Sequence, residues 1–377
     1  MRPHLPRIVF VSVLGLAAGG CGAGLPDPDL IAHPRILALD AVVEAPADPV
    51  LGTRAEAMPF ESVRFTPHLA DPDGPFDPQS IAALDPQWFA CTLRPGQGVG
   101  GCLLDARPLD PAAIPACPAP DAVDPGALDP SDPSSFESPT PCRLTEGPPE
   151  APTLPVFLDP LFLLGGDLEV AFVAGLGGAY DTDRCVADLL SEPGTPLSYD
   201  CLVGVRRLAI GPDSTLAALA ESFGVPAPGP PPPDPPETPD YNPVLDAITV
   251  TVSGQGGPFE IASGELVEAP IGALLEVVVS FTPDSEQDYL IVVDDAGTPR
   301  YETRTERLTG DFSSTWGYIE FGDSQGLEHR NQWTLMQAEE QDPKLPGDVV
   351  HLFVVVRDDR TGATFVEIPV RLTGPGP

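Results

Sequence analysis

The sequence predicts a mainly β protein with two immunoglobulin-like β-sandwich regions joined by a proline-rich spacer. Short runs of alternating apolar and polar residues recur along the chain, turn-forming residues separate these runs, and helical periodicity is sparse. A tract with ten prolines in eighteen residues, 226–243, divides the chain. Proline has no backbone N–H and favours polyproline II geometry, so we expect this tract to be a semi-rigid linker.

The first region is expected to span residues 34–225. Its predicted strands are Arg35–Val43, Val63–Leu69, Gln87–Leu93, Asp167–Ala174 and Leu202–Ile210. The sequence ADPDG, residues 70–74, indicates a turn, and residues 184–190 indicate one or two helical turns. A helix is predicted over Asp213–Phe223, with Asp213 or Ser214 as its N-cap. Proline, aspartate and cysteine dominate residues 94–153, which predicts an irregular insertion.

The second region, residues 244–377, has a clearer β pattern. Ile248, Val250 and Val252 alternate with polar residues, which is typical of a strand with one buried face. Further strands are predicted at Leu274–Phe281, Tyr289–Val293, Val349–Val356 and Val366–Leu372. The sequence RDDRTG, residues 357–362, forms a turn before the last of them. Several short strands between turns predict an antiparallel sandwich.

The N-terminus reads as a secretory signal peptide covering residues 1–20. Arg2 and Arg7 precede an apolar run over Ile8–Ala18. A membrane-spanning helix needs about twenty apolar residues, and the eleven found here argue against a permanent transmembrane anchor. The residues Ala18-Gly19-Gly20-Cys21 resemble a lipobox, although ordinary signal-peptidase cleavage is the alternative. We therefore expect lipid attachment at Cys21.

Lipidation at Cys21 would join a diacylglycerol, and then an acyl chain such as palmitate, to the first residue of the mature protein. More than one chain gives a firm membrane anchor, with residues 21–33 as its tether. Gly22, in place of aspartate, favours sorting to the outer membrane. The predicted location is the cell envelope, on the periplasmic or the surface face.

Net charge narrows the range of partners. The chain carries a formal charge of −37, and removing the two arginines of the signal peptide makes it −39. Nucleic acids and anionic membrane surfaces bind basic patches, so we expect no nucleic-acid partner. The acidity is explained either by a solvated surface or by divalent cations.

Calcium is the one ligand for which the sequence offers candidates, because hard cations bind carboxylates and carbonyl oxygens in turns. Three short acidic segments contain them: Asp71 and Asp73, Asp181 and Asp183, and Asp294 and Asp295. None has EF-hand spacing. Aspartate in turns also bonds to the local backbone, so local turn structure is the alternative, and no cofactor is required by these patterns.

Six cysteines remain after Cys21, and an even number in an exported chain indicates disulfides. Fifteen pairings are open. We predict pairing between neighbours in the sequence: Cys91 with Cys102, Cys117 with Cys142, and Cys185 with Cys201. A zinc site is the alternative, but no CxxC pair and no nearby histidine cluster supports it.

The sequence contains no HExxH or SxxK pattern, and its one match to GxSxG, GDSQG at 322–326, is not interpreted as a nucleophile elbow. The four mature histidines, His33, His68, His329 and His351, are scattered and are expected to be solvated or hydrogen-bonded side chains. The glycine-rich segment 96–101 lacks a strand–helix frame and reads as a loop. We therefore predict no catalytic residue and no enzymatic activity.

An aromatic group, Trp316, Tyr318, Phe321 and Trp333, allows two interpretations. The rings could stack on sugars, as in a carbohydrate-binding module. They could instead fill the space between two sheets, which we favour.

Several segments resemble hypothetical lipoproteins of myxobacteria and related deltaproteobacteria. They are the lipobox, PRILAL (34–39), LADPDG (69–74), WFAC (88–91), YNPVLDAITV (241–250) and VVVRDDRTGATF (354–365). This family has no established activity, so the resemblance implies only an envelope location and a β architecture. The expected function is a lipid-anchored binding, adhesive or structural component with an envelope protein or polysaccharide as partner. An envelope enzyme with an unrecognised site is the alternative.

Overall fold

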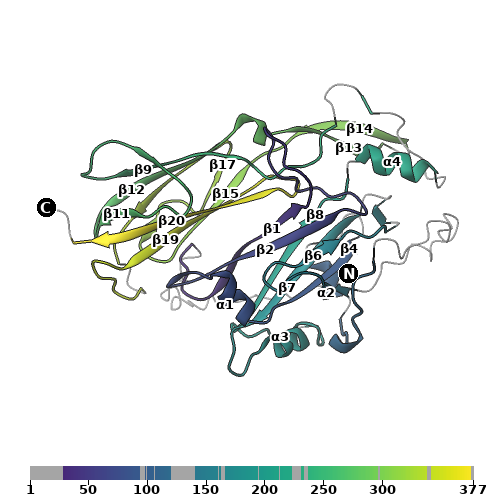
Figure 1. Ribbon diagram of the computed structural model, residues 1–377, viewed down its shortest axis with the longest axis horizontal. Coiled ribbons are helices and arrows are strands. Elements are labelled where there is room, and N and C mark those ends of the chain that lie inside the picture. Colours follow the sequence, from purple (N-terminus) through teal and green to yellow (C-terminus); the bar gives the residue numbers. More distant parts are fainter. Residues whose placement is uncertain are drawn as a thin grey trace, which may run out of the picture.

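The computed structural model describes residues 29–93, 98, 100–105, 107–119, 141–159, 161–162, 166–193, 195–211, 213–222, 231–232, 237–295, 298–337 and 341–374. Strands account for 47% of it and helices for 11%, with the sheets packed in sandwiches. This confirms the predicted mainly β fold. Figure 1 shows a C-terminal sandwich, coloured green to yellow, beside an N-terminal one, coloured purple to teal. The predicted signal peptide and Cys21 lie outside the described residues.

The first sheet of the N-terminal sandwich is built around β2. Its strands are β1 (Arg35–Val43), β2 (Ser62–Asp71), β3 (Gly74–Pro75) and β6 (Thr153–Pro155). All pairings with β2 are antiparallel. Alternation along β2 places Val63, Phe65 and Leu69 inside, because successive side chains point to opposite faces of a sheet.

The second sheet of this sandwich is buried on both faces. Its strands, in order, are β5 (Cys142–Arg143), β4 (Gln87–Leu93), β7 (Asp167–Gly175) and β8 (Cys201–Leu208). One face meets the first sheet, where Trp88 lies between Phe65 and Phe172 at centroid distances of 6.1 and 5.0 Å. A second apolar cluster covers the other face and includes residues of α3 (Thr182–Leu189).

The remaining short helices belong to connections of the N-terminal half. They are α1 (Pro78–Ala83), α2 (Gly101–Asp105), the 3-10 helix η1 (Pro111–Ala113) and α4 (Asp213–Ser222). Two of the helices, α3 and α4, lie where helical turns were expected. Among the described residues, no helix is both long enough and apolar enough to cross a membrane.

The C-terminal sandwich consists of two five-stranded sheets. The first contains β10 (Phe259–Ile261), β9 (Leu245–Val252), β12 (Leu274–Phe281), β18 (Glu328–Thr334) and β16 (Tyr318–Ile319). The second contains β11 (Val267–Pro270), β20 (Ala363–Thr373), β19 (Val349–Arg357), β15 (Thr309–Ser314) and β17 (Asp323–Gln325). The inward residues of both sheets form one apolar core, and β11 joins β20 in parallel.

A two-stranded hairpin extends from the C-terminal sandwich. It contains β13 (Asp288–Asp295) and β14 (Thr298–Thr305) and follows the 3-10 helix η5 (Pro283–Ser285). In Figure 1 the hairpin lies next to α4. It thereby brings the C-terminal half against the end of the N-terminal half.

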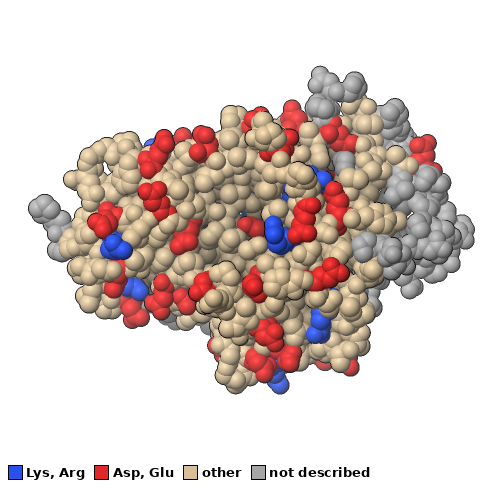
Figure 2. Space-filling model, in the orientation of Figure 1, with Lys and Arg blue, Asp and Glu red and all other residues tan. Residues whose placement is uncertain are grey.

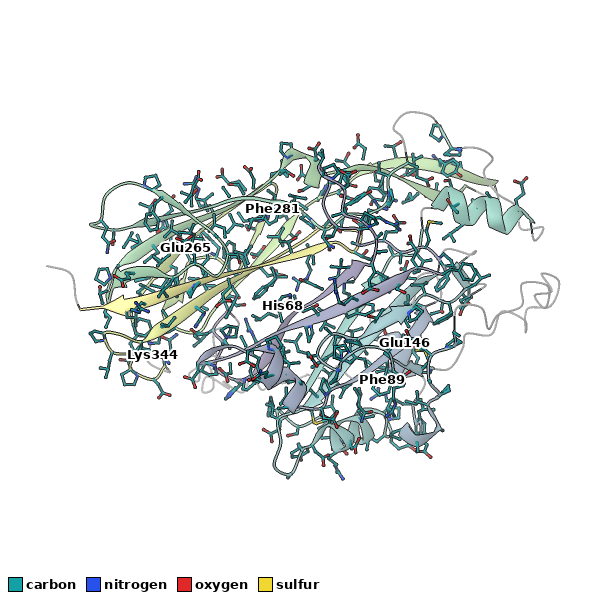
Figure 3. All side chains as sticks on the ribbon, viewed as in Figure 1. His68, Phe89, Glu146, Glu265, Phe281 and Lys344 are labelled. Atoms are coloured by element: carbon teal, nitrogen blue, oxygen red, sulfur yellow. A yellow bond between two sulfur atoms is a disulfide. The ribbon has the colours of Figure 1, made fainter. Side chains whose placement is uncertain are left out.

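The two sandwiches are in direct contact along β1, β2, β19 and β20. Ile31, Ala70 and Phe353 form a small buried cluster between them. The ring of His68 on β2 stacks on that of Phe365 on β20 at a centroid distance of 4.1 Å, and Figure 3 shows His68 between the two halves. Leu30 also makes a β-bridge with Ser314. Apolar packing and backbone hydrogen bonds thus join the halves.

Candidate functional site: an ionic junction between the sandwiches

A cluster of charged side chains lies where the two sandwiches meet. Its members come from both sandwiches and from the connecting segment, and they are Glu56, Arg206, Asp240, Glu306, Asp358 and Arg360. Glu56, Asp240 and Glu306 are almost completely buried. Burying a charge is costly unless it has partners, so the contacts of each group determine what the cluster does.

Arg360 connects two carboxylates across the junction from the turn between β19 and β20. Its Nη2 donates to Oε2 of Glu56 at 2.6 Å, and its Nη1 donates to Oε1 of Glu306 at 3.0 Å. The guanidinium carbon lies 4.7 Å from the ring centroid of Tyr289. Burial by itself lowers the pKa of Arg360, but the carboxylates of Glu56, Asp240 and Glu306 outweigh it and raise that pKa. Arg360 is therefore a charged link between the sandwiches.

Two further arginines donate to backbone carbonyls at the junction, and each reaches one carbonyl of the opposite sandwich. Arg206 on β8 donates through Nη1 to the carbonyl of Leu39 at 2.6 Å and through Nη2 to that of Thr361. Arg357, at the end of β19, donates through Nη2 to the carbonyl of Leu37 at 3.0 Å. Burial lowers the pKa of Arg206. Each guanidinium satisfies carbonyl groups that the junction would otherwise leave without donors.

The end of the proline-rich segment is buried in this junction. Oδ2 of Asp240 accepts hydrogen bonds from N and Oγ1 of Thr361 at 3.0 and 2.8 Å. Asn242 donates through Nδ2 to the carbonyl of Ala41 at 3.2 Å and accepts from the N–H of Ala363 at 2.9 Å. The last residues of the predicted spacer are thus buried between the two sandwiches and hydrogen-bonded to both.

Three carboxylates of the cluster converge. Asp240, Glu306 and Asp358 each offer one oxygen, and these oxygens all lie within 4.8 Å of one another. Burial, followed by repulsion from Asp240, raises the pKa of Glu306 to about 7. Burial also raises the pKa of Asp240, and burial with its two acidic neighbours raises that of Asp358 well above its usual value. Such a group can hold protons or a hard cation.

Grooves border the β19–β20 turn on two sides. One has a volume of about 390 Å³ and is lined by β1, β8 and the turn, including Asp358 and Arg360. The other has a volume of about 280 Å³ and is lined by Glu56, Tyr289 and Arg360 among others. The charged cluster therefore adjoins space that small ions and water can enter.

The calcium candidates predicted from the sequence lie elsewhere and apart from one another. Oδ1 of Asp71 accepts from the backbone N–H groups of Asp73 and Gly74 at 2.8 and 3.1 Å. Asp181 is the N-cap of α3, and Asp183 accepts a hydrogen bond from Gln87. The side chains of Asp294 and Asp295, at the end of β13, lie outside the described part. The two described pairs thus act in local structure, and calcium binding by any of the three pairs stays a prediction.

Disulfides are present in the N-terminal half. Cys117 pairs with Cys142, and Cys185 pairs with Cys201, as the order in the sequence predicts. Cys91 is also disulfide-bonded; the side chain of its predicted partner, Cys102, lies outside the described part of the chain. The first bond lies within the irregular insertion, and the second joins α3 to β8.

The four aromatic residues of the C-terminal half divide into two environments. Trp316 and Trp333 are buried in the core, where Nε1 of Trp333 donates to the carbonyl of Trp316 at 2.8 Å. Tyr318 and Phe321 are 54% and 55% exposed. Core packing thus accounts for both tryptophans, and a sugar-binding surface would have to use the two exposed rings.

Hydrogen bonds engage three of the four histidines. His68 pairs with Asp40 at 2.7 Å, and His351 pairs with Glu367 at 2.9 Å. His329 is buried, its Nδ1 lies 2.7 Å from Oγ of Ser324, and burial lowers its pKa to about 4. These histidines serve structure, as expected, and they do not gather in one place.

Sequence reasoning missed the converging carboxylates. Asp240, Glu306 and Asp358 are far apart along the chain, and abundant acidic residues hide such a set. Asp240 lies in the proline-rich tract and Asp358 in the RDDRTG segment, and neither segment has a pattern that relates it to the other. Each was interpreted as part of a linker or turn.

The fold and the junction together define a protein of two β-sandwiches that are held together in part by buried ion pairs. No protein-family profile matches the chain, and no curated protein is significantly similar to it.

Proposed function

We propose that the chain is a lipid-anchored protein of the bacterial cell envelope that acts as a binding, adhesive or structural component. The observation that carries this proposal is the combination of the lipobox at Ala18–Cys21 with the disulfides of the folded part. Disulfides persist in oxidising compartments outside the cytoplasm. The resemblance to deltaproteobacterial lipoproteins and the residue Gly22 support an outer-membrane location.

The junction supports a display role. Ion pairs, carbonyl-bound arginines and the buried end of the proline-rich segment join the two sandwiches, so we propose that they act as one body. An anchored body of this kind holds its surface at a set distance from the membrane.

Figure 2 shows acidic side chains spread over the visible face with fewer basic ones, and such a surface suits partners that are not polyanionic. An envelope protein or a neutral polysaccharide is the partner class we propose.

Metabolic labelling tests the anchoring. Cells that express the full chain incorporate radioactive palmitate into it, and the label follows the outer-membrane fraction in a density gradient. Replacement of Cys21→Ala removes the acceptor sulfur and abolishes labelling, whereas Gly22→Ala, next to it, retains the label. Equal labelling of the Cys21→Ala variant would show that Cys21 is not the lipidated residue and would overturn the proposal.

A further inference from the structure

Asp240 and Asp358 each have one carboxylate oxygen with hydrogen bonds and one without. Oδ2 of Asp240 accepts from Thr361, and Oδ1 of Asp358 accepts from the N–H groups of Arg360 and Gly362 at 3.0 and 2.9 Å. Their other oxygens, Oδ1 of Asp240 and Oδ2 of Asp358, are buried and make no hydrogen bond. Asp240 is 0% exposed. A buried carboxylate oxygen without a hydrogen-bond partner is costly, and each of these two atoms lacks a hydrogen-bond donor.

The side chains of Asp240 and Asp358 are each held in place by the hydrogen bonds to one carboxylate oxygen. Thr361 holds Asp240, and the β19–β20 turn holds Asp358, while Oε2 of Glu306 accepts from the N–H of Gln287 at 3.2 Å. The three residues nonetheless present oxygens within 4.8 Å of one another. Repelling groups held close by other contacts form a preorganised set of ligands rather than a chance encounter of exposed acids.

Charge within the cluster is unbalanced. Its carboxylates outnumber its guanidinium groups, with Glu56, Asp240, Glu306 and Asp358 against Arg206 and Arg360. With all four carboxylates ionised, two negative charges remain without a counter-charge inside the set, and the raised pKa values of Glu306 and Asp358 show that protons take up this excess when no cation is bound. A divalent cation would neutralise the same two charges.

A backbone oxygen adjoins the same place. The carbonyl oxygen of Tyr241 and Oδ2 of Asp358 lie 2.8 and 2.0 Å from the point that a Cβ on Gly362 would occupy. Because Gly362 has no Cβ, the carboxylate of Asp358 can lie against the turn. Carboxylates combined with a backbone carbonyl are the oxygen ligands that calcium takes in proteins.

We infer that Asp240, Glu306 and Asp358 form a calcium site where the end of the proline-rich segment meets the C-terminal sandwich. Calcium binds oxygens at about 2.3–2.6 Å, so ligands on opposite sides of the ion lie up to about 5.2 Å apart, whereas magnesium at about 2.1 Å limits them to about 4.2 Å. The three oxygens lie within 4.8 Å of one another, which is inside the calcium limit, and the choice of calcium over magnesium rests on the combination of carboxylate and carbonyl ligands. With few protein ligands, the affinity belongs in the range of extracellular modules, about 10⁻⁴–10⁻³ M.

The site would tie the end of the proline-rich segment to both the β14–β15 loop and the β19–β20 turn. It differs from the three acidic pairs predicted from the sequence. The inference goes beyond the proposed function and does not depend on it, because calcium binding is measured on purified protein whatever membrane the protein occupies. Labelling at Cys21 and calcium binding can therefore fail separately.

Isothermal titration of the purified full chain in detergent, freed of metal with EDTA, tests the site with CaCl₂ and with MgCl₂. The variant Asp240→Asn/Asp358→Asn keeps the size of both side chains and removes two charges. The matched control Asp246→Asn/Asp284→Asn removes two charges from exposed positions of the C-terminal half that belong to no candidate calcium site. We expect wild type and control to bind calcium at one site, and the junction variant to bind at least about tenfold more weakly.

Thermal unfolding followed by circular dichroism provides the second measurement. Calcium raises the unfolding temperature of wild type and control but not of the junction variant, and magnesium has a smaller effect. Without calcium the junction variant unfolds no earlier than wild type, because it lacks the repelling charges, so a lost response is not a folding failure. Absent binding by wild type, undiminished binding by the junction variant, or equal effects of both metals would each overturn the inference.

Discussion

Replacement of Arg360→Met tests whether the ionic junction holds the two sandwiches together. Methionine preserves much of the apolar stem but removes the charge that faces Glu56 and Glu306, at 2.6 and 3.0 Å. Removing one partner of a buried ion pair costs about 3–5 kcal/mol, because the other charge stays buried without compensation. Loss of the contact with Tyr289 adds about 0.5–1 kcal/mol. We expect the free energy of unfolding to fall by about 4–5 kcal/mol.

An exposed arginine offers a matched control. Arg330 also lies between two glutamates, Glu276 and Glu328, but its side chain is 57% exposed. Exposed pairs contribute about 0–1 kcal/mol, so Arg330→Met should change the stability little. The contrast between the two variants isolates the effect of burial from that of charge pairing.

Urea unfolding in the presence of EDTA measures both variants by tryptophan fluorescence. Trp88 reports on the N-terminal sandwich, and Trp316 with Trp333 reports on the C-terminal one. In the Arg360→Met variant we also expect the two sandwiches to unfold at separate urea concentrations, since the link between them is weakened. A cost for Arg360→Met no larger than that for Arg330→Met would refute the reasoning.

Two further predictions concern the two halves separately. His329 has a folded pKa of about 4 and an ordinary value of 6.5, so the unfolded chain binds more protons between these values. The neutral form of His329 therefore contributes stability above pH 6.5, and about 3 kcal/mol of it is lost as the pH falls toward 4. Urea unfolding should show no such loss for His329→Gln, whereas the exposed control His33→Gln should retain it. Identical pH profiles for the two variants would contradict the assignment. Replacing Cys185→Ala together with Cys201→Ala opens a link across 16 residues and should lower the free energy of unfolding by about 3 kcal/mol. The urea midpoint followed by tryptophan fluorescence should fall accordingly, and an unchanged midpoint would contradict a stabilising role of this disulfide.

Most of the strands could be predicted because their pattern is local. β1, β4 and β12 have the bounds that alternation and turn residues indicate, and β9 and β20 differ only at their ends. Strands such as β14 and β15 were missed. The first is polar and forms an extending hairpin with β13, and the second has glycine and aspartate beside its buried Phe312. Their pairing partners, rather than their own composition, make them strands.

The candidate site could not be predicted in the same way. The sequence suggested carboxylates in short acidic segments, where neighbours along the chain share a turn. In the structure, Asp71 and Asp181 bond to nearby backbone, and the converging oxygens come from residues 52 or more positions apart. Local spacing carries no information about such a set, because only the packing of the two sandwiches brings its members together.

By itself the sequence indicated the β character, and pairing of neighbours in order predicted two disulfides that the structure contains; the export signal and the lipobox stay predictions from the same kind of local pattern. These features depend on local periodicity, on the composition of short segments and on short loops. Only the tertiary structure decided that the end of the proline-rich segment is buried, that Arg360 bridges Glu56 and Glu306, and that Asp240 meets Asp358. The physical reason is that the stability of buried charges depends on partners supplied by distant parts of the chain, and sequence distance does not limit which parts meet.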